Sequence, residues 1–260
     1  MSTITLQSAL LTRRSLLAMW RQPAYVVMTL VQPVIWLLLF GALFQNVVEI
    51  PGFSGAGTSY IDFITPGVIM MTALFSATWA GTVYIEDMKL GVMDRLLASP
   101  VRRGAMISGT LAYQSVVTAL QSVAVLAIGF AAGARFASPV TGTLLTLAAA
   151  TLLTVFFAAL SNAMALLVRQ QEALIGISQL VSLPLAFLSA TLMDLSLAPQ
   201  WIQTLAAYNP LNWAVEVSRE ALSADPDWFV VWSRLGFLAG IALVMAWLAT
   251  RAFSTYQKSV

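Results

Sequence analysis

Long apolar runs, almost free of charged residues, are the feature of this sequence that most limits its fold. A helix needs about 20 mostly apolar residues to cross the hydrocarbon core of a bilayer. Six segments meet this requirement: Tyr25–Phe44, Ile61–Tyr84, Ile107–Ala132, Gly142–Val168, Ala173–Met193 and Trp232–Phe253. Only 9% of the 260 residues are charged, whereas about 25% are charged in a typical soluble domain. The sequence therefore predicts an all-α integral membrane protein, in which residues 1–260 form one domain with six transmembrane helices.

The Lys and Arg residues are distributed unequally between the two sides of the predicted spans. If the N terminus is cytoplasmic, three of the 13 basic residues lie outside and the other ten lie inside. Cytoplasmic loops of membrane proteins carry an excess of Lys and Arg, so we expect both termini to be cytoplasmic. The formal net charge of +2 belongs to this topology signal and indicates no nucleic-acid partner.

The residue types on which many enzymes depend are missing from the sequence. There is no cysteine and no histidine, which excludes thiolate and imidazole catalysis and the zinc, haem or iron–sulfur sites built on these side chains. Lys89 and Lys258 are the only lysines, and neither follows a glycine-rich phosphate-binding loop. We therefore expect a chain that is not an enzyme and that holds no cofactor or metal of its own.

Residues 4–21 precede the first span and show a weak helical pattern. Leu6, Leu10 and Leu17 fall on one side at 100° per residue, and Arg13 interrupts that side. This pattern predicts an amphipathic interfacial helix that lies on the inner leaflet before the chain enters the membrane.

The cytoplasmic segment 86–100, between spans two and three, contains a second short helix. Gly91 and Pro100 bound it. Its apolar side chains share one face and its charged side chains point away: Val92, Met93, Leu96 and Leu97 against Asp94 and Arg95. Such a face fits a groove on a partner protein, or it packs back on the inner leaflet. The pattern alone leaves both interpretations open.

The outer segment 194–231 is half apolar, and Asn209-Pro210 divides it into two short helical stretches. Because a long connection without its own structure is unusual, we expect two re-entrant helices that dip partly into the outer leaflet. Glu216 and Arg219 stand three residues apart, a spacing that predicts an ion pair on one helix face. This pair either has a function or is an ordinary surface pair.

Polar side chains within the spans have two interpretations. They are spaced along helix faces in spans one, three and five: Gln32; Gln114, Thr118 and Gln121; Ser178, Gln179 and Ser182. They line a path for a cargo, or they form hydrogen bonds between helices, and the second interpretation is favoured. No ionisable residue lies at the middle of a span, which argues against a proton- or ion-coupled transporter. It also favours a hydrophobic or amphipathic cargo.

Two glycine pairs have the spacing that permits close helix contact. They are Gly129 with Gly133 and Gly236 with Gly240. The signal is weak because glycine is common in membrane helices.

Four segments carry a resemblance to a known family: Gln32–Gly41, Tyr60 with Pro66-Gly67, Gly91–Pro100 and Asn209–Glu216. The sequence resembles the membrane subunit of type-2 ATP-binding-cassette (ABC) exporters, close to the daunorubicin-resistance type, over nearly its whole length. One departure concerns the run before the cytoplasmic helix, which in the family is often E-R-E-x-G. The residues here are Glu86-Asp87-Met88-Lys89-Leu90-Gly91, and Glu86 is the counterpart of the family glutamate.

The resemblance implies a fold, partners and roles. Two such subunits, of the same chain or a paralogue, form an outward path for amphipathic or lipid-like cargo in a bacterial inner membrane. Two separate cytoplasmic ABC ATPases hold the ATP and Mg²⁺. The implied roles are ATPase coupling for Glu86, Gly91, Val92, Met93, Asp94, Arg95, Leu96 and Leu97, and an outer gate for Asn209, Pro210, Trp213, Glu216 and Arg219. The alternative is a membrane scaffold that transports nothing, and a membrane-bound enzyme is disfavoured because no catalytic constellation is present.

Overall fold

The computed structural model describes residues 3–49, 59–98 and 102–256, and their regular structure is entirely helical. The elements are α1 (Thr3–Trp20), α2 (Pro23–Leu43), η1 (Gln45–Glu49), α3 (Tyr60–Thr78), α4 (Thr82–Lys89), α5 (Val92–Ala98), α6 (Arg103–Ala131), α7 (Pro139–Val168), α8 (Gln171–Phe187), η2 (Leu195–Leu197), α9 (Gln200–Ala207), α10 (Pro210–Leu222) and α11 (Trp228–Tyr256).

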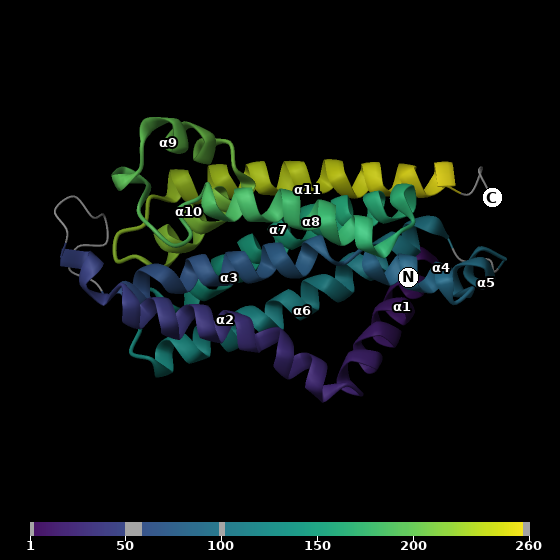
Figure 1. Ribbon diagram of the computed structural model, residues 1–260, viewed down its shortest axis with the longest axis horizontal. Helices are drawn as coiled ribbons and strands as arrows, with labels where there is room; N and C mark the ends of the chain where they lie inside the picture. The colour runs from purple at the N-terminus through teal and green to yellow at the C-terminus, as the bar shows by residue number, and fades with distance from the viewer. Residues whose placement is uncertain (1–2, 50–58, 99–101, 257–260) are drawn as a thin grey trace.

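The long helices α2, α3, α6, α7, α8 and α11 run along the long axis of the molecule, and α1 crosses that axis obliquely (Figure 1). Helices α4 and α5 lie at the same end as the first and last described residues, and α9 lies at the other end. The segments predicted to be cytoplasmic thus lie at one end of the bundle and the predicted outer helix α9 at the other, and which end faces the cytoplasm stays a prediction.

All six apolar segments are helical, but their lengths differ. Four are long and apolar enough to cross a membrane: Tyr60–Lys89, Gly104–Ala131, Pro139–Val168 and Trp228–Phe253. The apolar helices Val27–Leu43 and Gln171–Phe187 are shorter. The described residues thus form an all-helical chain of membrane-protein type with four candidate spans, and the other two predicted spans stay predictions.

The predicted fifth span continues to Met193, but α8 ends at Phe187. The carbonyls of Leu185 and Leu188 accept hydrogen bonds from the side-chain amide of Asn209, at 2.7 and 2.8 Å. The backbone N–H of Ala190 donates to the side chain of Asn212 at 2.9 Å. The N-cap of α10 and a residue of its first turn therefore provide hydrogen bonds for three backbone groups where α8 ends.

The predicted second span is divided into α3 and α4 by a turn at residues 79–81. Gly81 lies against α7 so closely that a Cβ at this position would be 2.4 Å from the carbonyl oxygen of Ser161. The Ser161 hydroxyl accepts from Gly81 N at 3.0 Å and donates to the Thr78 carbonyl at 2.6 Å. A single serine of α7 therefore satisfies the backbone on both sides of the break.

Helix α3 is the most deeply buried of the long helices and forms the centre of the apolar core. It packs against α7, α6, α2 and α10, and Ile64, Ile69 and Met70 are fully buried. Gly67 allows the closest approach, because a Cβ there would overlap the Thr191 carbonyl oxygen at 2.0 Å. Two capping residues fix the start of the helix: Ile61 N donates to Ser59 Oγ, and Ser59 N donates to Asp62.

Helix α1 packs against α6 through Ser8, Leu11 and Thr12. The hydroxyls of Ser8 and Ser108 are 2.6 Å apart, and Thr12 donates to the Gly109 carbonyl at 3.0 Å. The leucines of the predicted apolar side, among them Leu10, are exposed. This arrangement leaves an apolar face free for lipid, and the interfacial location stays a prediction.

Candidate functional site

A cavity of about 570 Å³ lies between α2, α3, α6 and α8. Its wall is mostly apolar and aromatic, with three kinds of polar group: hydroxyls, side-chain amides and the indole N–H groups. The lining residues are Thr29, Gln32, Pro33, Trp36, Val68, Met71, Thr72, Phe75, Ser76, Trp79, Ala80, Thr82, Val83, Tyr113, Gln114, Val117, Gln121, Gln179, Leu183, Ala186 and Phe187. None of these side chains carries a charge. The volume and the wall are typical of a site for a small, largely apolar ligand.

The two glutamines that α6 contributes to the cavity are both buried, but they differ in hydrogen bonding. Gln114 donates through Nε2 to the hydroxyl of Ser76 at 2.6 Å. Gln121 is 5% exposed, and its Oε1 has no hydrogen-bond partner among the described residues. Gln32, on α2, lines the same cavity and is exposed.

Gln179 of α8 also lines the cavity, whereas Thr118, Ser178 and Ser182 do not. Thr118 and Thr154 join α6 to α7 through a buried hydrogen bond of 2.9 Å between their hydroxyls. Ser178 donates to the Thr78 carbonyl at 2.8 Å, and Ser182 donates to the Ser178 carbonyl at 2.7 Å. For Thr118 and Ser178, the geometry is that of hydrogen bonds between helices. The aromatic wall gave no separate signal in the sequence, because aromatic residues are ordinary in apolar spans.

Two apolar residues of the segment predicted to be cytoplasmic, Met93 and Leu96, face the protein itself. Gly91 has a φ of 65°, a left-handed conformation that favours glycine and separates α4 from α5. Met93 is fully buried in the core and Leu96 packs against it. The side chains of Asp94 and Leu97 lie outside the described part of the structure. The sequence pattern offered a partner groove or the inner leaflet, whereas the structure places Met93 against this chain's own helices.

At the end of the bundle where α4 and α5 lie, other residues of the same segment are exposed. Glu86, Lys89 and Arg95 are exposed, and Leu90 is 66% exposed at the turn between α4 and α5. Arg14 of α1 approaches Asp87 at 3.5 Å and connects the first helix to α4.

Helix α10, in the predicted outer segment, follows a residue that also donates hydrogen bonds to the end of α8. Asn209 is the N-cap, and its Oδ1 accepts from Leu211 N at 2.9 Å. Pro210 follows at the first helical position, where its missing N–H costs nothing. The indole N–H of Trp213 donates to the Ala207 carbonyl at 2.7 Å and joins α10 to α9.

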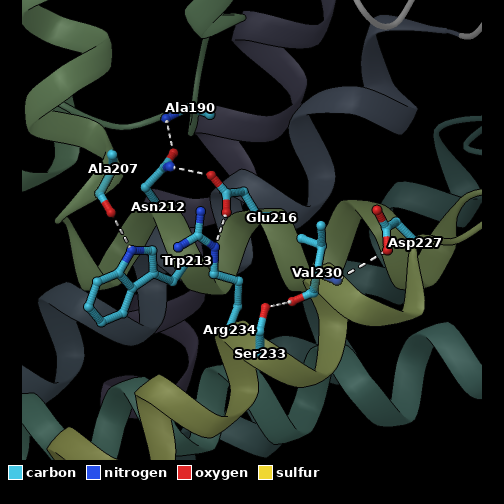
Figure 2. A network of polar contacts seen from close by, with 9 residues as sticks. All are labelled: Ala190, Ala207, Asn212, Trp213, Glu216, Asp227, Val230, Ser233 and Arg234. Atoms are coloured by element: carbon cyan, nitrogen blue, oxygen red, sulfur yellow. Dashed lines mark hydrogen bonds and ion pairs between the residues drawn. The ribbon is translucent and has the colours of Figure 1, made fainter.

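A polar network continues along α10 (Figure 2). Asn212 donates through Nδ2 to Glu216 Oε1 at 2.7 Å, and Arg234 of α11 donates through Nε to Glu216 Oε2, also at 2.7 Å. The predicted pairing of Glu216 with Arg219 is therefore wrong. One carboxylate oxygen of Glu216 faces Asn212 and the other faces α11. Glu216 therefore pairs with Arg234, which lies on that helix.

Arg219 instead points into the protein. Its guanidinium lies over the Phe63 ring at 3.6 Å from the ring centroid. It also donates to the backbone carbonyls of Phe63 and Ala190. Burial lowers the pKa of Arg219 to about 9, while Asp194, Tyr60 and Glu216 raise it, so the side chain is a cation at neutral pH. Arg219 thus fastens α10 to α3 and to the segment after α8.

An all-helical chain of membrane type, with an uncharged cavity among its long helices, has the architecture of a membrane permease. Comparison with known proteins identifies the family. The family profile of the ABC-2 type transporter matches residues 6–222, so this chain belongs to that family, whose members are transport permease subunits. This confirms the resemblance that the sequence motifs carry.

Two relatives illustrate the match. The daunorubicin resistance ABC transporter permease protein DrrB1 of Streptomyces coeruleorubidus is 28% identical over 255 residues, which cover 96% of this chain and 87% of the relative. A protein of Porphyra purpurea that carries the name transport permease ycf38 is 31% identical over 220 residues, covering 84% of this chain and 74% of the relative.

Proposed function

We propose that this chain is the membrane subunit of an ABC exporter and moves an amphipathic or lipid-like substrate outward. The observation that carries the proposal is the cavity of about 570 Å³ between α2, α3, α6 and α8. Its aromatic and amide wall is suited to a molecule with a large apolar part and a small polar part. Relatives named for drug resistance support the same direction of transport.

The energy comes from partner subunits in this proposal. Two cytoplasmic ABC ATPases hold ATP and Mg²⁺, and a second permease, the same chain or a paralogue, completes the pathway. Both chain termini and the α4–α5 segment face the cytoplasm of a bacterial cell, with the protein in the inner membrane. The exposed residues Glu86, Leu90 and Arg95 form the contact with the ATPase, and the buried Met93 transmits the motion of α5 to the core.

The outer segment acts as a gate in the same proposal. Asn209 and Arg219 both bond backbone carbonyls of the segment that follows α8. Movement of α10 therefore requires that these bonds break or that α8 moves with it. This coupling supports a gate that opens together with α8, one wall of the cavity.

The ATPase contact is tested with exposed residues rather than with the apolar face of α5. In the variant Leu90→Asp/Arg95→Glu, a partner ATPase expressed with the permease should no longer copurify, because the apolar contact is lost and a charge is reversed. The matched control is Leu205→Asp on α9 at the other end, where Leu205 is 49% exposed. The control should retain the ATPase. Copurification of the ATPase with the double variant would contradict the proposed contact.

Transport itself separates this proposal from the scaffold alternative. The permease and its ATPase are reconstituted in vesicles, and ATP-dependent movement of a fluorescent amphiphile is followed. Movement that needs both subunits and ATP is expected. A complex that assembles and hydrolyses ATP but moves none of a panel of amphiphiles would favour the scaffold.

A further inference from the structure

We infer that the exposed side of α1 binds anionic phospholipids, and that Arg13 and Arg21 bind their phosphate groups. The inference goes beyond the proposed function, which assigns no ligand to α1. It depends on three observations: the residues that α1 leaves exposed, the charge balance of the N-terminal part of the chain, and the contacts of α1 with the α4–α5 segment.

The first observation is the composition of the exposed side. The side of α1 that does not contact α6 exposes three leucines: Leu6, Leu10 and Leu17. Arg13 and Arg21 are exposed as well, one turn before and one turn after Leu17. Arg21 belongs to this helical path because its backbone N–H donates to the Leu17 carbonyl at 3.2 Å. Arginines so placed reach past apolar side chains to the phosphates of lipids whose acyl chains the leucines contact.

The second observation is a local excess of positive charge. The sequence has no acidic residue before Glu49, but α1 and the turn after it carry three arginines. Arg14 has a partner, Asp87 of α4, at 3.5 Å. Arg13 and Arg21 form no ion pair or side-chain hydrogen bond with any described residue. A guanidinium binds a phosphate through two parallel hydrogen bonds. An anionic lipid therefore supplies the countercharge that these two side chains lack, whereas the amine of a zwitterionic lipid cancels much of the attraction.

The neighbouring helix indicates a lipid leaflet, and not an acidic protein, as the partner. The predicted span α2 begins at Pro23, two residues after Arg21. Its first turns expose Val27 and Met28, as a helix surrounded by lipid does. A partner on the exposed side of α1 therefore lies next to the medium that surrounds α2. The leaflet on the cytoplasmic side, where α1 is predicted to lie, carries negative charge.

The third observation is that α1 contacts both ends of the segment that contains α5. Arg14 pairs with Asp87 before α5. Gln7 Oε1 accepts a hydrogen bond from the backbone N–H of Arg102 after α5, at 3.0 Å. A lipid that holds α1 against the leaflet therefore also restrains the segment proposed to contact the ATPase. This consequence rests on the proposed function, whereas the lipid binding does not.

The test uses the absence of cysteine from the sequence. The variant Ala9→Cys places a single thiol at an exposed position one turn before Arg13, and a bimane fluorophore is attached to it. The full-length permease is reconstituted in vesicles of phosphatidylcholine and phosphatidylglycerol, with bromine on the acyl chains of one lipid or of the other. Bromine quenches only a fluorophore that it contacts, so the two series give the ratio of the two lipids beside α1. We expect phosphatidylglycerol to be enriched at least about fivefold, and less as salt is raised.

The double variant Arg13→Gln/Arg21→Gln should bring this ratio close to that of the bulk lipid. Arg13→Lys/Arg21→Lys keeps the charge and should retain most of the enrichment, which separates loss of charge from loss of fold. The control Arg135→Gln, at an exposed arginine between α6 and α7, should leave the ratio unchanged. Equal quenching by both lipids in the unchanged protein, or enrichment that survives in the double glutamine variant, would overturn the inference. Quenching by neither lipid would show that something else covers α1 and would overturn it as well.

ATP hydrolysis by the assembled complex tests the consequence for the α4–α5 segment. Hydrolysis should be faster by a factor of about two to five with phosphatidylglycerol than with phosphatidylcholine alone, and the double glutamine variant should lose this difference. Equal rates in both lipids, with the enrichment intact, would contradict the link to α4–α5. Because quenching needs neither ATP nor the ATPase, the two proposals can fail separately. Enrichment without ATP-driven transport would contradict the proposed function alone, and transport without enrichment would contradict this inference alone.

Discussion

Arg234 Nε donates a hydrogen bond to Glu216 Oε2 at 2.7 Å, and this ion pair joins the short outer helix α10 to α11. Both side chains are a little over one quarter exposed. The other carboxylate oxygen accepts from Asn212, whose own oxygen accepts from Ala190 N. A single chain of hydrogen bonds thus connects α11, α10 and the segment after α8 (Figure 2).

The variant Glu216→Gln should lower the free energy of unfolding by about 1–2 kcal/mol, because a charge-assisted hydrogen bond becomes a neutral one. Partial exposure keeps the loss below that of a fully buried pair. Thermal unfolding of Glu216→Gln, Arg234→Gln and the double variant measures the coupling, for which we expect about 1 kcal/mol. Glu172→Gln, at an exposed glutamate, is the control. Strictly additive losses would show that the pair contributes nothing.

Gly67 and Gly236 are both helical glycines, but the space around them differs. A Cβ on Gly67 would lie 2.0 Å from the Thr191 carbonyl oxygen, while nothing lies within 4 Å of a Cβ on Gly236. Gly67→Ala should therefore lose at least about 2 kcal/mol of stability through overlap with backbone. Gly236→Ala should be neutral or gain up to about 1 kcal/mol from helix propensity. Unfolding temperatures in detergent compare the two, and equal shifts would contradict the close approach of α3 to residue 191.

The hydrogen bond between Thr118 and Thr154 can be used to test whether Thr118 serves helix packing or lines the transport pathway. Thr118→Val leaves the hydroxyl of Thr154 without its partner and should cost about 0.6–1.7 kcal/mol. The double variant Thr118→Val/Thr154→Val replaces both hydroxyls by methyl groups of the same shape, so it should recover much of that loss. Transport should change little in both variants, because neither residue lines the cavity. A large loss of transport in the double variant, with stability intact, would instead place Thr118 on the pathway.

Much of the helical framework could be predicted from the sequence. The apolar runs located α2, α3, α6, α7, α8 and α11, because solubility in a bilayer depends on local composition and on length. Asn209-Pro210 marked the start of α10, because an N-cap followed by proline is a local signal. Gly91 marked the turn before α5 for the same kind of reason.

The sequence predicted less of the contacts between helices. The expected partner of Glu216 was three residues away, but the observed partner is on the next helix, because the fold orients the two carboxylate oxygens toward Asn212 and Arg234. The apolar face of α5 predicted contact with a partner protein or with the inner leaflet. Met93, on that face, is instead buried in this protein's own core. The spacing of Gly236 and Gly240 permits close helix contact, but nothing among the described residues lies within 4 Å of a Cβ at either position.

The sequence by itself determined that this protein is a membrane protein built of helices, since composition and apolar run length are properties of the chain. Only the tertiary structure decided which polar side chains share a cavity and which bond to each other. Gln121 and Thr118 stand three residues apart on one helix, yet one faces a cavity and the other faces Thr154. That difference arises because α7 packs against only one side of α6, and a spacing along the chain does not specify which side.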